Sequence, residues 1–275
     1  MSKVIINGVE DSKLSVSDRG FQYGDGLFET ITYKNNQLQL WKEHLQRLND
    51  SCDRLSLKKV DESLWLEDVK KLDLDNDSVI KLSLSRGNSA RGYRYDEESN
   101  VTRVTASFDL PSYPEDNQSG INAIICKTPV SMNTALAGMK HLNRLDNVLA
   151  RNEWNDKAIT EGFMLDNQGH IIEGTMSNVF CVLGAELYSP QLEQCGVAGI
   201  MRQQVIDIAE DLNIPVNIVD ISKPNFMQMD AVFITNSLIG LWPVKTITDG
   251  ENDVTFQQNE LIDIIRKRLQ QLVAD

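Results

Sequence analysis

Apolar and polar residues alternate between residues 28 and 33, where threonine and isoleucine are frequent, and this pattern predicts a strand. The first part of the chain is expected to hold further strands at 4–6, 38–40, 79–84 and 101–108. Asn7 and Gly8 follow the first strand, and both tolerate the positive φ of a tight hairpin turn. We therefore expect the chain to fold back on itself at this point.

A longer helical pattern lies between residues 41 and 57. Apolar residues recur there at the three- and four-residue steps of one helix face: Trp41, Leu45, Leu48, Cys52 and Leu55. A second helix is expected at 63–72, and residues 86–94 are expected to form a loop between two strands. The first part of the chain is thus predicted to mix strands with helices.

Composition changes at residues 111–120, where prolines, glycine and polar residues stand without an apolar period. This segment is the expected linker between two domains, 1–110 and 121–275. The second domain is expected to hold strands at 121–126, 162–165, 171–172, 179–182 and 231–235, and helices at 141–154, 201–212 and 261–273. The helix at 141–154 is expected to have an apolar face of Leu142, Leu145, Leu149 and Ala150. The sequence thus predicts a two-domain α+β fold, with a small-molecule site at the domain junction.

The composition is typical of a soluble globular protein, because 41% of the 275 residues are hydrophobic and 24% are charged. The net charge is −13 and the sequence pI is about 4.7, so nucleic acid and anionic membranes are unfavourable partners. A small anionic substrate is still compatible with this charge, since a few arginines can make a local positive pocket. We expect no signal peptide and no membrane-spanning segment, because the apolar stretches have only strand length.

The cysteines are widely scattered, at positions 52, 126, 181 and 195, and none forms a CxxC pair. The chain has three histidines, so we expect no structural zinc site and no other metal site. Reduced thiols in a cytoplasmic protein are the expected state of the four cysteines.

Lys140 is the first candidate for chemistry. It follows the small and apolar residues Ala137, Gly138 and Met139 and stands before the expected helix. Most lysines are solvated surface residues, which is the simpler interpretation. A desolvated lysine, in contrast, has a lowered pKa, and its free amine can form a Schiff base with a carbonyl group.

Three other segments carry candidate groups. Residues 18–29 contain three closely spaced glycines, which allow a close backbone approach but are also explained by a tight connection. Glu173 stands at a strand end before Gly174, where it is either solvated or facing the nitrogen of a pyridine ring. Residues 196–201 read Gly-Val-Ala-Gly-Ile-Met and lead into a helix, whose first N–H groups can bind phosphate.

In order and spacing, these segments resemble the class IV aminotransferase family, the pyridoxal-phosphate enzymes of fold type IV, over nearly the whole chain. Within that family, several segments are similar to the aminodeoxychorismate lyases: residues 86–93, 140–145, 195–202, 235–238 and 242–244. The resemblance implies a smaller N-terminal α/β domain and a larger, mixed and barrel-like C-terminal domain, with the cofactor at their junction. It also implies a homodimer.

The resemblance assigns a role to each candidate. Lys140 would hold pyridoxal 5′-phosphate as a Schiff base, and Glu173 would pair with the pyridine nitrogen. The cofactor phosphate would be bound by Arg47, by the backbone of Ile200 and Met201, and by the hydroxyl of Ser237. Arginine suits this role because its fork of N–H donors matches phosphate oxygens and stays charged.

The implied reaction is the elimination of pyruvate from 4-amino-4-deoxychorismate, which leaves 4-aminobenzoate for folate biosynthesis. Lys140 would also act in it as the acid–base group. Arg91 is expected to bind a substrate carboxylate, with Tyr93 as a hydrogen-bond donor. Residues 88–90 read Asn-Ser-Ala, which is less glycine-rich than expected for such a lyase, and so the loop departs from the family's pattern.

Two alternatives remain open. One is a class IV transaminase acting on D-amino acids or branched-chain amino acids. A branched-chain enzyme would carry a tyrosine soon after the lysine, where residues 143–146 read Asn-Arg-Leu-Asp, and a D-amino acid enzyme would carry a histidine where Gly92 and Tyr93 follow Arg91. The other is a non-catalytic α+β binding protein in which Lys140 is a surface lysine.

Overall fold

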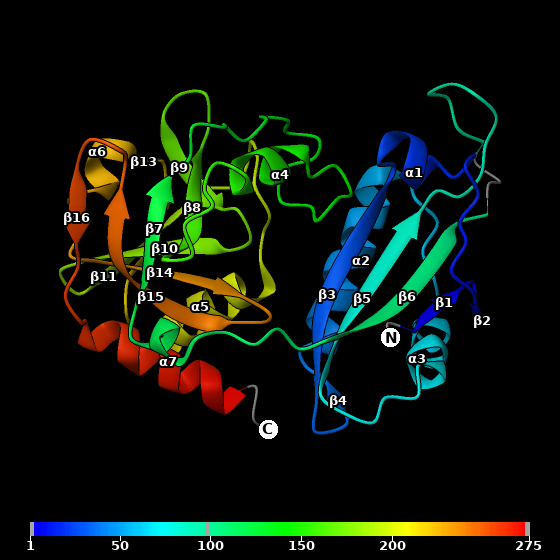
Figure 1. Ribbon diagram of the computed structural model, residues 1–275, viewed down its shortest axis with the longest axis horizontal. Coiled ribbons are helices and arrows are strands. Elements are labelled where there is room, and N and C mark those ends of the chain that lie inside the picture. Colours follow the sequence, from blue (N-terminus) through cyan, green and yellow to red (C-terminus); the bar gives the residue numbers. More distant parts are fainter. Residues whose placement is uncertain (1–2, 97–99, 273–275) are drawn as a thin grey trace. The chain divides into compact units, whose positions relative to one another are not determined.

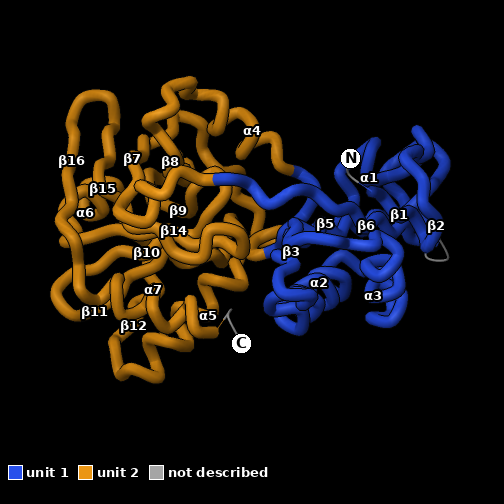
Figure 2. The backbone as a smooth tube through the Cα atoms, turned by 60° about the horizontal axis from the view of Figure 1, so that its bottom comes forward, with its two compact units in different colours: residues 1–112, 139–143 blue, residues 113–138, 144–275 orange. Residues whose placement is uncertain are grey.

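The structure is a computed structural model that describes residues 3–96 and 100–272. The chain divides into two compact units (Figure 2). Unit 1 comprises Met1–Ser112 together with Met139–Asn143, and unit 2 comprises Tyr113–Gly138 and Arg144–Asp275. A five-residue segment that contains Lys140 thus belongs to unit 1, although the residues on both sides of it belong to unit 2.

Within the described residues, unit 1 contains a six-stranded sheet with the order β2-β1-β6-β5-β3-β4 (Figure 1). Its strands are β1 (Val4–Ile6), β2 (Val9–Glu10), β3 (Gly26–Lys34), β4 (Gln37–Leu38), β5 (Ser78–Ser85) and β6 (Thr102–Asp109). All neighbours are antiparallel. Asn7 and Gly8 connect β1 to β2 with φ of 50° and 87°, so the predicted hairpin is confirmed.

Helices α2 (Trp41–Leu55) and α3 (Glu62–Lys71) pack against the sheet of unit 1, on β3 and β6 respectively. The bounds of both helices agree with the predicted ranges, 41–57 and 63–72, to within two residues. The helix residues Leu48, Cys52 and Trp65 are buried, as are Ile31 and Ile80 of the strands. The core of unit 1 therefore consists of the apolar positions that give the sequence its period.

Residues 18–24 form a short helix where the sequence indicated only a tight connection. The Asp18 side chain accepts a hydrogen bond from the N–H of Gly20 (2.8 Å) and caps α1 (Arg19–Tyr23). Gly24 ends α1 in the left-handed conformation, with φ of 66°. A Cβ on Gly26 would lie 2.3 Å from the carbonyl oxygen of Leu84, so the close approach of β3 and β5 requires glycine there.

The described part of unit 2 forms a ten-stranded mixed sheet, with the order β12-β11-β10-β14-β15-β7-β8-β9-β13 and β16 paired to β15. Its strands are β7 (Ile121–Ile125), β8 (Ile159–Leu165), β9 (His170–Gly174), β10 (Asn178–Leu183), β11 (Glu186–Pro190), β12 (Val216–Val219), β13 (Ile221–Ser222), β14 (Ala231–Asn236), β15 (Gly240–Thr248) and β16 (Asp253–Thr255). Its apolar core includes Phe163 and Phe226, whose rings meet edge to face at 5.1 Å.

The helices of unit 2 are α4 (Leu145–Arg151), α5 (Ile200–Asp211), α6 (Lys223–Phe226) and α7 (Glu260–Leu272). A 3₁₀ turn, η1 (Glu115–Gln118), lies within the expected linker. The predicted helices at 201–212 and 261–273 are confirmed as α5 and α7. Val273, the last residue of the second of these ranges, lies outside the described residues. Helix α5 contacts both α7 and strand β14.

The helix expected at 141–154 is shorter than predicted, because α4 begins only at Leu145. Residues 140–142 are instead hydrogen-bonded along β3, through Phe28 N to Lys140 O and Leu142 N to Gly26 O, both 2.9 Å. The first of these bonds occupies the carbonyl of Lys140, which would accept the first internal hydrogen bond of a helix that began at residue 141. The expected apolar face is also wrong, since Leu145 and Leu149 are 74% and 59% exposed.

Across the described residues, no helix combines the length and the apolar character that are needed to cross a membrane. The four cysteines all lie in the described part of the chain, where their thiols are free and buried.

Candidate active site

Lys140 lies in unit 1 on a short extended segment that pairs with the beginning of β3. Leu27 and His141 form an antiparallel bridge, flanked by the two hydrogen bonds to Lys140 and Leu142 already described. The side chain of Asn143 continues this pairing, because its Nδ2 donates to Gly24 O at 3.0 Å. The backbone of Lys140 is therefore fixed on both sides by hydrogen bonds to one strand.

The ammonium group of Lys140 lies against an aromatic ring. Its Nζ is 4.5 Å from the ring centre of Phe28, and the Lys140 side chain is half-buried. Met139, the preceding residue, is only 1% exposed. Lys81 of β5 reaches the same ring, with its Nζ 5.2 Å from the centre. Lys140 is thus half-buried beside an apolar residue and an aromatic ring, and its role as a desolvated amine stays a prediction.

Arg47 lies on α2 and pairs with a buried carboxylate of β3. Its Nε donates to Glu29 Oε1 at 2.8 Å, and its second terminal nitrogen contacts Glu29 Oε2. His44 Nδ1 lies 2.7 Å from the same Oε2. Burial alone would raise the pKa of Glu29, but the charge of Arg47 and the hydrogen bonds from both partners outweigh it and lower the pKa to about 2. Glu29 is thus an ionised group that orients Arg47.

Glu173 lies in unit 2, near the end of β9, and is 4% exposed. Its Oε2 accepts a hydrogen bond from Val197 N at 2.8 Å, and Asn178 Nδ2 donates to Val197 O, also at 2.8 Å. Glu173 and Asn178 therefore hold the loop that precedes α5 from two sides. A Cβ on Gly199 would lie 1.9 Å from Asn178 Oδ1, so this loop requires glycine at the N-cap of α5.

Ile200 and Met201 are the first two residues of α5, where backbone N–H groups lack partners within the helix. Ser237 follows β14, whose residue Thr235 pairs with Asn178 of β10. Among the residues that the structure describes, the Thr235 hydroxyl oxygen is buried without a hydrogen-bond partner. Such an orphaned hydroxyl, two residues from Ser237, fits a site completed by a polar ligand. The sequence alone gave no reason to select Thr235.

Glu161 of β8 is a second functional candidate that sequence reasoning missed. It is fully buried and accepts hydrogen bonds from the Thr175 hydroxyl (2.6 Å) and the Ser177 hydroxyl (2.7 Å). The N–H of Thr175 donates to it as well, at 2.9 Å. Burial raises the pKa of Glu161 in spite of these donors. Glu161 thus fixes the turn that begins two residues after Glu173.

Arg91 and Tyr93 lie together on the exposed loop after β5 in unit 1. Arg91 is exposed, and Tyr93 is 86% exposed. The ring of Tyr93 lies 5.5 Å from the ring of Tyr23, with 59° between their planes. The structure thus places the two predicted substrate residues on one loop, while the predicted cofactor residues are divided, Lys140 and Arg47 in unit 1 and Glu173, Ile200, Met201 and Ser237 in unit 2.

The fold and these side chains define the class of the protein. Residues 26–247 match the family model described as Amino-transferase class IV, and the chain therefore belongs to this family of enzymes. Its two units have the fold-type IV architecture, with the α+β organisation predicted from the sequence.

Among its relatives, the chain is 32% identical to the aminodeoxychorismate lyase of Vibrio harveyi over 258 residues, which cover 93% of this chain and 95% of the relative. It is 27% identical to the D-alanine aminotransferase of Bacillus licheniformis, over 90% of this chain and 89% of that enzyme. The crystal structure of 4-amino-4-deoxychorismate lyase from Pseudomonas aeruginosa is similar with a TM-score of 0.92 and 37% identity, over 98% of each chain.

Proposed function

We propose that the chain is a 4-amino-4-deoxychorismate lyase, which uses pyridoxal 5′-phosphate to release pyruvate and leave 4-aminobenzoate for folate biosynthesis. The observation that carries the proposal is Lys140, whose backbone is pinned to β3 while its ammonium lies against Phe28. A rigidly presented, half-buried lysine suits covalent attachment to an aldehyde. The likeness to the lyases of Vibrio harveyi and Pseudomonas aeruginosa supports the choice of reaction.

The described residues fit the proposed cofactor. Lys140 would hold it covalently, and the buried carboxylate of Glu173 would face its ring nitrogen. The anionic phosphate would be bound by Arg47, the first N–H groups of α5 at Ile200 and Met201, and the hydroxyl of Ser237. The orphaned Thr235 hydroxyl supports a polar ligand near Ser237.

When bound, pyridoxal phosphate supplies an electron sink for the substrate carbon that bears the amino group. Glu173 would keep a proton on the pyridine nitrogen, which strengthens that sink. The Lys140 amine would take the proton from the carbon that bears nitrogen and then return a proton to the methylene carbon of the departing enolpyruvyl group. The C–O bond to this group breaks, pyruvate leaves, and the ring becomes aromatic, so no second substrate is required.

The substrate carries two carboxylates, which need cations in a chain with a net charge of −13. Arg91 would bind one of them, and the Tyr93 hydroxyl would donate a hydrogen bond. Arg91 and Arg94 are both exposed on this loop, and residues 86–95 contain no acidic residue, which supports the loop as the place of the anionic groups.

We also propose that the enzyme works as a cytoplasmic homodimer. Leu145, Val148 and Leu149 of α4 are between 52% and 74% exposed, which is typical of a face covered by another subunit.

Burial raises the pKa of Cys52, Cys126 and Cys195 to about 12, so these thiols would stay protonated and unreactive in a reducing compartment.

A class IV transaminase is the second candidate, and the 27% identity to a D-alanine aminotransferase favours keeping it. The two reactions are separated by their products. The purified protein, supplied with pyridoxal phosphate, should convert 4-amino-4-deoxychorismate to fluorescent 4-aminobenzoate and an equal amount of pyruvate. A parallel assay supplies D-alanine with 2-oxoglutarate, and rapid amino transfer there without any 4-aminobenzoate would overturn the lyase proposal.

The cofactor lysine is tested separately. Borohydride reduction of the yellow protein should fix the cofactor on Lys140, as located by mass spectrometry of the peptides. Lys140→Ala should abolish both the visible absorbance and turnover. Lys81→Ala is the matched control, because its ammonium lies over the same Phe28 ring, and it should retain the covalent cofactor. Reduction at any other lysine would contradict the assignment.

A further inference from the structure

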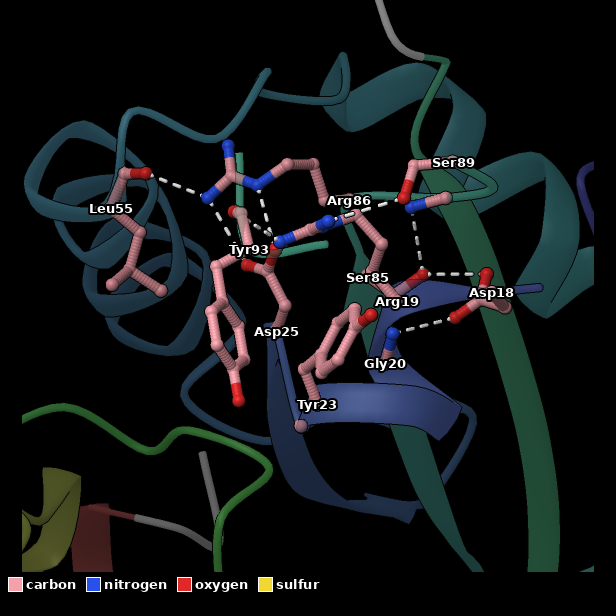
Figure 3. Close-up of polar contacts among 12 residues, drawn as sticks. Asp18, Arg19, Gly20, Tyr23, Asp25, Leu55, Ser85, Arg86, Ser89 and Tyr93 are labelled. Atoms are coloured by element: carbon pink, nitrogen blue, oxygen red, sulfur yellow. Dashed lines mark hydrogen bonds and ion pairs between the residues drawn. The ribbon is translucent and has the colours of Figure 1, made fainter. Parts of the chain in front are cut away.

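The glycine-containing segment 18–29 carries a buried charge cluster in unit 1 (Figure 3). The carboxylate of Asp25 accepts hydrogen bonds from two arginines, Arg19 Nε at 2.7 Å and Arg86 Nε at 2.9 Å. Arg19 and Arg86 are only 3% and 6% exposed. Burial would raise the pKa of Asp25, but its hydrogen bonds with Arg86 and Arg19 and their charges lower it. The carboxylate therefore stays ionised between two cations.

Arg86 attaches this cluster to the end of α2. Its two terminal nitrogens donate to Leu55 O and Ser56 O, each at 2.8 Å. These carbonyls end the helix and have no partner further along it, so a buried cation is well placed there. The guanidinium also lies 3.8 Å from the ring centre of Tyr95. One side of the cluster is thus anchored to regular secondary structure.

Arg19 attaches the other side of the cluster to the loop after β5. One terminal nitrogen donates to the Ser89 hydroxyl (3.1 Å) and to Gly92 O (3.0 Å), and the other donates to Tyr93 O (3.0 Å). Its backbone N–H donates to Gly87 O at 2.8 Å. The turn 89–93 is therefore closed across the side chain of Arg19, which bonds to both of its ends.

Tyr23 supports the same turn from α1. Its hydroxyl accepts a hydrogen bond from Gly92 N at 3.3 Å, and its ring packs beside Tyr93. The Arg19 guanidinium lies 4.9 Å from the ring centre of Tyr23. Arg91 stands between the anchored ends of the turn and is exposed. The cluster holds the backbone on both sides of Arg91 while leaving its side chain accessible.

We propose that Arg19 and Asp25 are positioning residues for the anionic substrate, because they fix the conformation of residues 89–93 and thereby the place of Arg91. The identity of the substrate rests on the proposed function, whereas the fixing of the loop does not. Arg19 cannot be exchanged freely, since its planar fork makes four hydrogen bonds that a lysine or an amide cannot reproduce. A cation displaced by about 1 Å can cost about a hundredfold in activity.

Tryptic cleavage of the cofactor-free protein tests the fixing of the loop, because Arg91 and Arg94 are themselves trypsin sites. Cleavage requires the chain to open locally around the bond. Arg19→Gln should be cut at these two bonds about tenfold faster than the wild type, and Arg19→Lys should be intermediate. Arg103→Gln is the matched control, since it breaks another buried pair of unit 1, Arg103 with Asp68 at 2.6 Å, and should be cut there at the wild-type rate.

Tyr23→Phe provides a milder second variant if Arg19→Gln does not fold, because it removes only the hydroxyl that contacts Gly92. It should be cut at Arg91 and Arg94 a few times faster than the wild type. The proposal is overturned if neither the Arg19 nor the Tyr23 variant is cut faster at these bonds than Arg103→Gln.

Steady-state kinetics with 4-amino-4-deoxychorismate test the consequence for the substrate. Arg19→Gln should raise KM about ten- to a hundredfold, with kcat changed by less than about threefold and the visible absorbance of the bound cofactor unchanged. Arg103→Gln should keep the wild-type KM. An unchanged KM in Arg19→Gln, or an equal rise in Arg103→Gln, would overturn the positioning role. If the wild type itself forms no 4-aminobenzoate, the proposed function fails, and the tryptic comparison still decides the role of Arg19 in the loop.

Discussion

Arg47 and Glu29 form a two-pronged ion pair that joins α2 to β3 in unit 1. One prong measures 2.8 Å between Arg47 Nε and Glu29 Oε1, and the Glu29 side chain is 1% exposed. The same β3 carries the segment that holds Lys140. The pair therefore fixes the direction of Arg47 relative to the strand on which Lys140 is mounted.

Arg47→Met should have two separable effects. It leaves the charged Glu29 carboxylate buried with His44 as its remaining side-chain partner. The free energy of unfolding, measured by urea denaturation without cofactor, should therefore fall by about 3 kcal/mol. It should also weaken pyridoxal phosphate binding. Adding Glu29→Gln should restore much of the stability but not the cofactor affinity. Lys42→Met, on the exposed face of the same helix, should change neither. Restored cofactor affinity in the double variant would contradict the phosphate role of Arg47.

The lowered pKa of Glu29 predicts a pH dependence of stability. A carboxyl with pKa 4.5 in the unfolded chain and about 2 in the folded one stabilises the fold fully above pH 4.5. This contribution, about 3.5 kcal/mol at about 1.4 kcal/mol per pKa unit, is lost as the pH falls from 4.5 towards 2. Urea unfolding of the wild type and of Glu29→Gln at several pH values should show the difference between them shrink over this range. A constant difference over this range would mean that folding does not lower the pKa of Glu29.

Glu173 allows its two contacts to be separated by the choice of substitution. Glu173→Gln keeps an oxygen that can accept from Val197 N, so the loop before α5 should stay in place and the cofactor should remain bound. An amide cannot hold the pyridine nitrogen protonated, and turnover should fall about a hundredfold or more. Glu173→Ala should lose the loop contact as well and bind the cofactor more weakly. Wild-type turnover in Glu173→Gln would exclude a role at the ring nitrogen.

Glu161→Ala should lower both stability and cofactor affinity, although Glu161 belongs to no motif. The substitution leaves the hydroxyls of Thr175 and Ser177 without their shared acceptor, whereas the N–H of Thr175 keeps its hydrogen bond to Gly162 O at 3.0 Å. Buried groups left unpaired in this way cost about 1–3 kcal/mol each. Thermal unfolding and cofactor titration measure the two losses. Glu186→Ala, at a half-buried position of β11, is the control for removing a carboxylate from the same sheet and should retain the wild-type cofactor affinity.

Local sequence patterns were sufficient where an element is defined by its own period. Helix α2 could be predicted because its apolar spacing coincides with its buried face, at Leu48 and Cys52. Strand β15 could not, since Gly240 and Pro243 interrupt its pattern and proline removes a hydrogen-bond donor. It is stable nevertheless, because it pairs along much of its length with β14 and β7.

The residues of the candidate site also fall into those that could be predicted from the sequence and those that could not. Lys140, Glu173 and Arg47 could be selected from the sequence by resemblance to a family, and they remain predictions as cofactor ligands. The extended pairing of Lys140 with β3 could not be foreseen, because it joins residues more than a hundred positions apart. Helical spacing was misleading there, since the next apolar residues, Leu145 and Leu149, are exposed. Glu161 was missed because its partners are revealed only when β8 and the turn after β9 come together.

The division of the chain has a consequence for any attempt to cut this protein into parts. The polypeptide leaves unit 1 at Ser112, returns for Met139–Asn143, and leaves it again. A fragment that ends at Ser112 would lack Lys140 and would leave the backbone groups of Gly26 and Phe28 without their partners. The complementary fragment would carry Lys140 on a segment deprived of its strand. A split gene would therefore have to encode both fragments in the same cell, because neither fragment alone contains a complete unit 1.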